Sequence, residues 1–292
     1  SFDYNKERFS YMIEIKELKR QYRRDADTLT VLNGIDLMIE KGSFTAVLGR
    51  NGCGKSTLAK HINVILRPQS GSVTVDGMDT RDEDLVYDIR ERAGMVFQDP
   101  DSQAVASTVE DDIAFAPENL GLDEDETERR IRFALDALKI DGLRRKTIST
   151  LSGGQKQLAA IAGILAMRPG YMIFDESTSM LDPASRKRIL DCVTKLRDEY
   201  GVSVIWITHY MDEAARADRV LIIDKGKIAA DGSPETVFSD TELIERCGLE
   251  LPQCARLCLM LKKAAYDLPR LALDARDLAE MAAGMLGMGG GK

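Results

Sequence analysis

A loop that can bind phosphate is the strongest chemical signal in this 292-residue sequence. The stretch Gly49–Thr57 reads GRNGCGKST and fits G-x-x-x-x-G-K-[ST], a pattern in which backbone N–H groups surround phosphate oxygens and a lysine reaches the outer phosphates. The apolar run Ser43–Leu48 precedes the loop, and Leu58, Ile62 and Ile65 follow it at helical spacing. This strand–loop–helix order places phosphate at the positive end of a helix. The residues expected to contact a nucleotide here are Gly49, Arg50, Asn51, Gly52, Cys53, Gly54, Lys55, Ser56 and Thr57.

A second turn offers similar chemistry. In Leu151–Gln155 (LSGGQ), two glycines let backbone amides approach an anion, and residues 156–167 read as a helix that begins there. One chain should not need two phosphate-binding helix starts, so the second is best explained if it covers a nucleotide held by a partner subunit. The residues expected to make this contact are Ser152, Gly153, Gly154 and Gln155.

Polar side chains end three of the predicted strands. Asp175 and Glu176 follow the strand 171–174, Gln98 follows 94–97, and His209 follows 202–208. A carboxylate at such a strand tip can hold Mg²⁺ together with Ser56, and the adjacent carboxylate can polarise an attacking water as general base. Glutamine can meet the metal and the water, and histidine can hydrogen-bond the γ-phosphate. We therefore predict that Glu176, His209 and Gln98 are catalytic, and that Ser56, Gln98 and Asp175 bind magnesium.

The elements that position these residues alternate between strand and helix patterns, which favours an α/β core with a parallel sheet. Alternating residues predict half-buried strands over 12–18 and 35–39, and hairpins over 72–77 and 220–230. Charge and helical spacing dominate from Gln98 to Arg168, which predicts a helical insertion over about residues 98–168.

The predicted domain organisation has two parts. Residues 1–240 form the phosphate-binding domain with its insertion. Residues 241–292 form a small helical region, which we expect to contribute to dimerisation and to end in a flexible glycine-rich segment, 284–292.

Composition narrows the classes of partner. The net charge of −8 disfavours a nucleic-acid partner, because phosphate contacts require clustered Lys and Arg. No apolar run approaches the roughly 20 residues that span a bilayer. The five cysteines form no C-x-x-C pair, which indicates reduced thiols in a cytoplasmic protein.

Together these motifs resemble the nucleotide-binding subunits of ATP-binding cassette (ABC) transporters. The resemblance implies an ABC ATPase fold of the P-loop NTPase class, with a mostly parallel RecA-like core, an antiparallel β subdomain and an inserted helical subdomain. It also implies that Ser179–Asp182 is the D-loop, with Asp182 near the nucleotide, that His209 is the switch histidine, and that Tyr22 stacks on adenine. The implied cofactors are ATP and Mg²⁺.

Further segments resemble the A subunits of energy-coupling factor (ECF) transporters, and the first of the two A-subunit types more than the second. These segments are Phe97–Gln103, Thr108–Phe115, Pro117–Asn119, Ser179–Pro183 and Leu249–Pro252. The resemblance implies an ATPase at the cytoplasmic face of the membrane that powers uptake of vitamins or of cobalt and nickel ions. Its implied partners are a second A-type subunit, a transmembrane coupling subunit and a substrate-binding membrane subunit.

The sequence departs from this family at three positions: Cys53 replaces a serine, Ser177 an alanine and Ala116 a glycine. A thiol beside Lys55 and a helix N-terminus is expected to have a lowered pKa. We also expect Asp111 and Asp112 to receive a basic coupling helix of the membrane partner, although an acidic first turn also satisfies the helix dipole.

Three alternative interpretations stay open from the residues. A soluble ABC protein of DNA repair or translation is disfavoured by the single cassette and the absence of sustained heptads. A regulatory module that binds nucleotide without hydrolysis is disfavoured by Glu176, Gln98 and His209. An ABC importer outside the ECF group is the third alternative.

Overall fold

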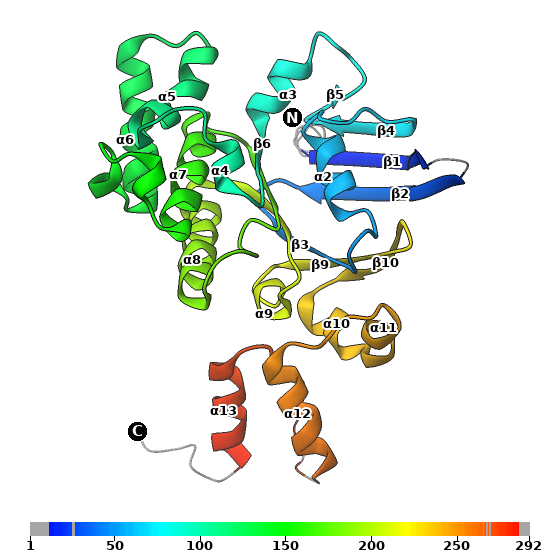
Figure 1. The fold of residues 1–292 in the computed structure, drawn as a ribbon. Coiled ribbons are helices and arrows are strands. Elements are labelled where there is room, and N and C mark those ends of the chain that lie inside the picture. The colour runs from blue at the N-terminus through cyan, green and yellow to red at the C-terminus, as the bar shows by residue number, and fades with distance from the viewer. Residues whose placement is uncertain (1–11, 25–26, 265, 267, 269, 286–292) are drawn as a thin grey trace, which may run out of the picture.

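The computed structural model describes residues 12–24, 27–264, 266, 268 and 270–285 (Figure 1). Its central element is a six-stranded sheet with the strand order β10-β9-β3-β8-β7-β6. The strands are β3 (Phe44–Leu48), β6 (Ala93–Val96), β7 (Tyr171–Asp175), β8 (Ser203–Ile207), β9 (Arg219–Asp224) and β10 (Lys227–Gly232). Neighbouring strands are parallel except for β9 and β10, which are antiparallel. The predicted parallel core is therefore confirmed.

A four-stranded antiparallel sheet, ordered β2-β1-β4-β5, forms the predicted β subdomain. Its strands are β1 (Met12–Arg24), β2 (Asp27–Glu40), β4 (Ser70–Val75) and β5 (Met78–Asp79). The alternation of buried residues breaks between Ile15 and Leu18, where the register shifts and Glu17 has a φ of 50°. This bulge lets both Ile15 and Leu18 face the core, and β1 continues past the end that the sequence pattern indicated.

Strands β3, β6, β7 and β8 of the central sheet are buried on both faces, which explains why they read as continuous apolar runs. Along β3, Phe44, Ala46 and Leu48 belong to the core on the helical side, and Val47 belongs to the core shared with the antiparallel sheet. In Figure 1 the helical insertion and the antiparallel sheet lie on opposite sides of the molecule. The phosphate loop follows β3, and the predicted site residues Asp175, Glu176 and His209 lie at or just beyond the ends of β7 and β8.

The insertion is mostly helical, as predicted, with an isolated β-bridge between Thr108 and Thr147. Its elements are α4 (Pro100–Gln103), α5 (Val109–Asn119), α6 (Glu124–Leu138), the 3₁₀ turns η1 (Asp141–Leu143) and η2 (Ile148–Thr150), and α7 (Gly153–Ala166). The guanidinium of Arg144 joins two of these helices, donating to Glu110 on α5 at 2.5 Å and to Glu128 on α6 at 2.6 Å. Helix α2 (Lys55–Ile62) follows the phosphate loop, and α3 (Val86–Arg92), which the sequence pattern had not indicated, precedes β6.

The remaining helices are α8 (Pro183–Tyr200), α9 (Met211–Ala214), α10 (Pro234–Ser239), α11 (Thr241–Arg246), α12 (Gln253–Lys263) and α13 (Ala275–Met285). Leu243 and Ile244 of α11 belong to the main core, whereas α12 and α13 enclose a small core of their own around Cys258, Leu268 and Ala272. The domain boundary at residue 241 stays a prediction. The first two residues of the expected flexible end 284–292 belong to α13, and the others lie outside the described residues.

No helix in the described part of the chain combines the length and the apolar character that crossing a membrane requires.

Candidate functional site

The phosphate loop connects the buried strand β3 to helix α2. Two of its glycines, Gly49 and Gly54, have backbone conformations at which an added side chain would clash. A Cβ on Gly49, which has a φ of 152°, would lie 2.4 Å from the carbonyl oxygen of Ile223. A Cβ on Gly54, at a φ of 112°, would lie 2.8 Å from the carbonyl oxygen of Val31. Gly54 also provides no side-chain cap for α2, so the first amides of this helix remain free of a capping side chain. The loop is therefore shaped to present backbone N–H groups to an anion.

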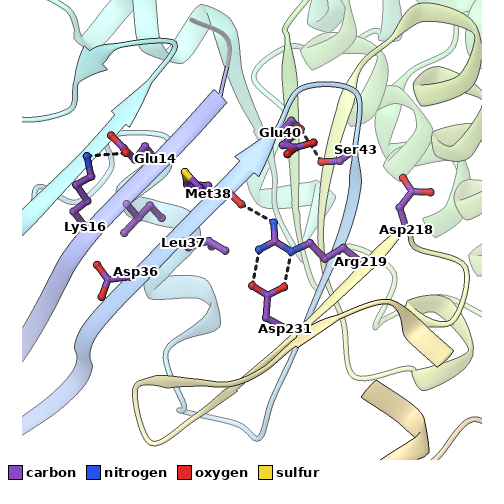
Figure 2. A pocket seen from close by; sticks show the side chains of 11 residues that line it. Glu14, Lys16, Asp36, Leu37, Met38, Glu40, Ser43, Asp218, Arg219 and Asp231 are labelled. Atoms are coloured by element: carbon purple, nitrogen blue, oxygen red, sulfur yellow. Dashed lines mark hydrogen bonds and ion pairs between the residues drawn. The ribbon is translucent and has the colours of Figure 1, made fainter. Parts of the chain in front are cut away.

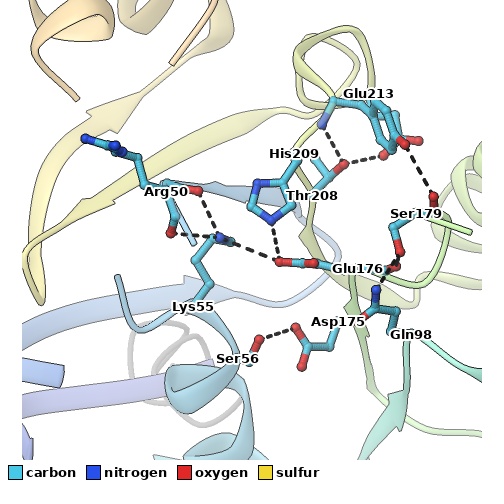
Figure 3. A network of polar contacts seen from close by, with 12 residues as sticks. Arg50, Lys55, Ser56, Gln98, Asp175, Glu176, Ser179, Thr208, His209 and Glu213 are labelled. Carbon is cyan, nitrogen blue, oxygen red and sulfur yellow. Dashed lines mark hydrogen bonds and ion pairs between the residues drawn. The ribbon is translucent and has the colours of Figure 1, made fainter. Parts of the chain in front are cut away.

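Lys55 extends from the start of α2 into the mouth of this loop (Figure 3). Only 4% of the residue is exposed, and its Nζ donates to the carbonyl oxygens of Gly49 at 2.8 Å and Arg50 at 3.3 Å. The same Nζ lies 3.6 Å from Oε1 of Glu176. A buried ammonium is thus held where the outer phosphates of a nucleotide would lie.

Asp175 and Ser56 meet as predicted for a magnesium site. The Ser56 hydroxyl donates to Oδ1 of Asp175 at 2.7 Å. Burial raises the pKa of Asp175, the hydrogen bond from Ser56 opposes this effect, and the charge of Glu176 adds to it. A divalent cation would offset the cost of this buried charge, and both groups supply oxygen, the ligand that Mg²⁺ prefers. Within the described residues no cluster of three or more His, Cys, Asp and Glu side chains could hold a metal ion.

Glu176 and His209 approach each other from neighbouring strand ends. Oε1 of Glu176 lies 2.6 Å from Nε2 of His209 (Figure 3). Glu176 adopts a left-handed φ of 53°, and its backbone N–H donates to the carbonyl of Ile207 at 3.1 Å. Such backbone strain in a non-glycine residue costs on the order of 1–3 kcal/mol and is concentrated at functional sites. The strained backbone directs this carboxylate away from the line of β7 and toward His209.

Gln98, predicted to meet the metal and the attacking water, is hydrogen-bonded to Ser179 in the structure. Its Nε2 donates to the hydroxyl of Ser179 at 3.1 Å, and this hydroxyl donates to the backbone carbonyl of Glu176 at 2.8 Å. The backbone before Gln98 is held in place by Gln103, whose Oε1 accepts from the N–H of Phe97 at 3.0 Å. The metal contact of Gln98 stays a prediction.

The second glycine turn forms the start of α7. Ser152 is the N-cap in a capping box, with its N–H donating to Oε1 of Gln155 at 3.0 Å. Ser152 and Gly153 are exposed, whereas a Cβ on Gly154 would lie 2.8 Å from Oγ of Ser185. The turn is therefore an exposed helix N-terminus supported from behind by the start of α8. The side chain of Gln155 accepts a hydrogen bond as part of this capping box, and a contact between Gln155 and a nucleotide stays a prediction.

Two residues assigned by resemblance have other partners in the structure. The Asp182 carboxylate caps α8, accepting from the N–H groups of Ala184 and Ser185 at 3.0 Å each, and the hydroxyl of Ser185 lowers the pKa of Asp182. Tyr22 on β1 is 37% exposed, and the guanidinium carbon of Arg20 lies 4.9 Å from the centre of its ring. The roles of Asp182 and Tyr22 at a nucleotide stay predictions.

The expectation for Cys53 is wrong in its direction. Burial raises the pKa of the thiol and outweighs the lowering effect of Lys55. Cys53 packs against the core shared with the antiparallel sheet, and a Cβ on Gly49 would lie 2.5 Å from its sulfur. The side chain thus points into the protein while the backbone of the loop stays outside.

Residues that the sequence analysis missed surround this site. Glu213 on α9 is buried and accepts hydrogen bonds from Thr178 and Thr208, which lie close in sequence to Glu176 and His209. Gly248, at the end of α11, lies against Arg50, since an added Cβ would be 2.9 Å from the Cδ of that arginine. No sequence pattern marks Glu213 or Gly248, because the contacts of Glu213 with Thr178 and of Gly248 with Arg50 join segments that meet only in the folded chain.

The pockets of the structure also indicate a functional site beside the phosphate loop. A pocket of 590 Å³ lies beside the phosphate loop, bounded by Gly49, Arg50, His209, Gly248 and Leu249 among others. A larger one, of 770 Å³, lies between the β1–β2 hairpin and the β9–β10 hairpin (Figure 2). Its two cationic side chains are paired with carboxylates of the same pocket: Lys16 with Glu14 at 2.7 Å and Arg219 with Asp231 at 2.5 Å. The smaller pocket is lined by His209 and by Gly49–Asn51 of the phosphate loop, so we place the functional site beside it.

Comparison with known proteins agrees with this geometry. The ABC transporter domain family matches residues 32–179. The energy-coupling factor transporter ATP-binding protein EcfA1 of Clostridium novyi (strain NT) is 47% identical over 271 residues, which is 92% of this chain and 96% of that protein. The structure of cbiO1 from Clostridium perfringens, described as part of the ABC transporter complex cbiONQ, superposes with a TM-score of 0.74 at 34% identity, covering 87% of this chain and 99% of that one. A dimeric post-hydrolysis structure of the ATP-binding cassette MJ0796, bound to ADP and Pi, has a TM-score of 0.69 at 25% identity, covering 76% of this chain and 98% of that one.

Proposed function

Because this chain belongs to the ABC transporter family, and within it to the ATP-binding proteins of energy-coupling factor transporters, we propose that its ATP hydrolysis drives uptake of a vitamin or a transition-metal ion through a membrane partner. The observation that carries the catalytic part is the meeting of Lys55, Glu176 and His209, with 3.6 Å and 2.6 Å between their charged or polar atoms. These groups converge at the carboxyl edge of a parallel sheet, where nucleotides bind in such folds.

The residues divide the chemistry among them. Loop amides and Lys55 bind the phosphates, and Glu176 acts as the general base that polarises the attacking water. His209 donates a hydrogen bond to the γ-phosphate, so ATP replaces the direct contact between Glu176 and His209. Ser56 and Asp175, with Gln98, would hold Mg²⁺, which supplies neutralisation of the phosphate charge.

Two copies share each ATP in this proposal. The phosphate loop of one copy faces the Ser152–Gly154 turn of the other, in which Ser152 and Gly153 are exposed. The MJ0796 cassette, solved as a dimer, supports this arrangement. To switch a partner almost completely between two states, ATP must favour the closed dimer by roughly 5.5 kcal/mol. Charge-assisted hydrogen bonds to a triphosphate from both copies can supply this difference. The exposed Leu257 and Met260 of α12 support a contribution of the C-terminal helices to dimerisation.

The membrane partner docks beside Gln98 in this proposal. A groove of 300 Å³ there is lined by Phe97, Val105, Asp112 and Phe115 among others. Asp112 accepts from the N–H groups of Val105 and Ala106 at 2.7 and 3.1 Å, so this carboxylate shapes the groove. The apolar contacts for a cytoplasmic helix of the partner come from Val105 and Phe115, which are exposed. The chain would then lie at the cytoplasmic face of the membrane.

Phosphate release tests the catalytic proposal. The purified chain should release phosphate from Mg-ATP, and Glu176→Gln should bind ATP with little change while turnover falls about 100-fold or more. Rapid turnover in that variant would remove Glu176 as the base. Failure of the unaltered chain to release phosphate would instead favour a module that binds without hydrolysis.

Assembly tests the docking proposal. Phe115→Ser should lower capture of the transmembrane subunit while the free chain keeps its ATPase activity. Tyr87→Ser is the matched control, because Tyr87 is 80% exposed but lies on α3 and does not line the groove. Equal capture by both variants would refute the groove as the docking site. Native mass spectrometry of the captured complex would then distinguish ECF partners from those of another importer type.

A further inference from the structure

A buried carboxylate on the short helix α9 contacts the segments of both proposed catalytic residues. Glu213 is 7% exposed and accepts hydrogen bonds from three side chains. Figure 3 shows Glu213 beside one of them, Thr208. The donors are the hydroxyl of Thr178 at 3.0 Å, the indole N–H of Trp206 at 2.9 Å and the hydroxyl of Thr208 at 2.5 Å. A buried charge is costly unless hydrogen bonds satisfy it, and these three donors do so.

On the histidine side, the hydrogen bonds fix the backbone before and after His209. The hydroxyl of Thr208 accepts from the backbone N–H of Tyr210 at 3.0 Å while donating to Oε2 of Glu213. The N–H of Glu213 in turn donates to the carbonyl of Tyr210 at 3.1 Å. The two neighbours of His209 are therefore connected to the same carboxylate or its backbone.

On the side of the general base, Glu213 contacts the turn that follows Glu176. Thr178 is two residues beyond Glu176 and donates to both carboxylate oxygens of Glu213, at 3.0 and 3.3 Å. The next residue, Ser179, closes this turn by donating from its N–H to the Glu176 carbonyl at 3.0 Å. One carboxylate thus connects the backbones at both ends of the 2.6 Å contact between Glu176 and His209.

We propose that Glu213 is a positioning residue for ATP hydrolysis, which holds the general base and the switch histidine in register through Thr178 and Thr208. The inference rests on the catalytic roles proposed above for Glu176 and His209. Its chemical requirement is an acceptor at both oxygens, because all three side-chain partners donate. A glutamine at position 213 would turn an NH₂ group toward at least one of these donors. The third donor, Trp206, lies inside β8, where its indole packs against Phe44 and Phe174, so it provides a control for the loss of one hydrogen bond to Glu213.

The test compares kcat and KM for ATP in variants of the full chain. Thr178→Val and Thr208→Val keep the side-chain shape but remove the hydroxyls, and each should lower kcat about 10- to 100-fold, because small misplacements of reacting groups cost rates of this order. KM for ATP should change less than about 3-fold, since the phosphate loop is untouched. Thr208→Ser should restore kcat, because it restores the hydroxyl. In a Glu213→Gln background, Thr208→Val should lower kcat little further, as expected for residues that act as a unit.

Trp206→Phe separates positioning from stability. It removes one hydrogen bond to Glu213 and should lower the melting temperature with a much smaller effect on kcat. If the two threonine variants lower kcat no more than Trp206→Phe at matched loss of melting temperature, Glu213 has only a structural role and the inference is refuted. If instead Glu176→Gln and His209→Ala keep rapid turnover, the proposed catalytic roles themselves are wrong, and these two failures are distinguishable.

Discussion

Replacing Gly154 by alanine perturbs the exposed turn without removing any of its polar groups. The added Cβ would lie 2.8 Å from Oγ and 2.9 Å from Cβ of Ser185, and the second atom cannot move without the backbone of α8. Overpacking of this kind costs about 1–3 kcal/mol, against about 1 kcal/mol that alanine contributes over glycine inside a helix. The start of α7 must therefore shift away from α8, and the net change in stability should be small.

The shift matters for function because this turn would contact a phosphate held by the other copy. We expect Gly154→Ala to lower kcat for ATP hydrolysis by about 10- to 100-fold. Nucleotide binding to the phosphate loop, measured by fluorescence of a labelled ATP analogue, should change little. Gly163→Ala is the matched control in the same helix, because its Cβ would meet only the carbonyl oxygen of Asp112, at an ordinary 3.7 Å.

A second-site change tests the stated cause. Ser185→Gly removes the atoms that the new methyl group would meet, so the double variant Gly154→Ala/Ser185→Gly should recover most of the turnover. Full activity of Gly154→Ala alone would refute the view that the position of this turn limits hydrolysis. Loss of turnover that Ser185→Gly does not relieve would show that the clash is not the cause.

Three further predictions concern other parts of the chain. Because burial raises the pKa of Cys53, alkylation of this thiol by iodoacetamide should be slower than that of a free thiol and should accelerate as the pH rises. Alkylation should inhibit ATP hydrolysis, and bound ATP should protect the thiol. Cys53→Ser should retain ATPase activity and resist inhibition by iodoacetamide. Hydrogen bonds from Arg130 and then Arg129 lower the pKa of Glu126 from 4.5 to about 2, so its contribution to stability is present above pH 4.5 and is lost as the pH falls toward 2. Melting temperatures of the unaltered chain and Glu126→Gln should therefore differ at neutral pH and converge in acid, and a constant difference would contradict this. Arg144→Met should lower the free energy of unfolding by about 1 kcal/mol in urea titrations, since it removes the partly exposed ion pairs that join Arg144 to Glu110 on α5 and to Glu128 on α6. No change would show that these pairs contribute nothing.

The sequence was most informative where local pattern and chemistry coincide. The phosphate loop, the strand that precedes it and the Asp175-Glu176 strand end could be predicted because parallel strands are continuous apolar runs that end at one edge of a sheet. The helical insertion was also predictable, because its charged helices have amphipathic spacing over many residues. Helix α3 was missed because it is only seven residues long and buries a single residue, Ile89.

Contacts between distant segments could not be predicted in this way. The hydrogen bond from Gln98 to Ser179 joins residues 81 positions apart, and nothing in either local pattern specifies it. For Cys53, proximity to Lys55 suggested a lowered pKa, but burial of the thiol has the larger effect and only the folded structure shows it. The proposed role of Glu213 could not be predicted either, because nothing in the sequence around a glutamate on a short helix indicates that three donors surround it in the fold.

Mixing two inactive variants tests most directly whether two copies share each ATP. Lys55→Ala removes the phosphate contact of one chain. Gly153→Asp places a negative charge at the exposed turn of the other, at a helix start where an acidic residue preserves folding. Each variant alone should be inactive, and an equal mixture should regain roughly one quarter of the normal ATPase activity, because half of the dimers are mixed and each has one intact site of two. A mixture as inactive as its components would contradict the account.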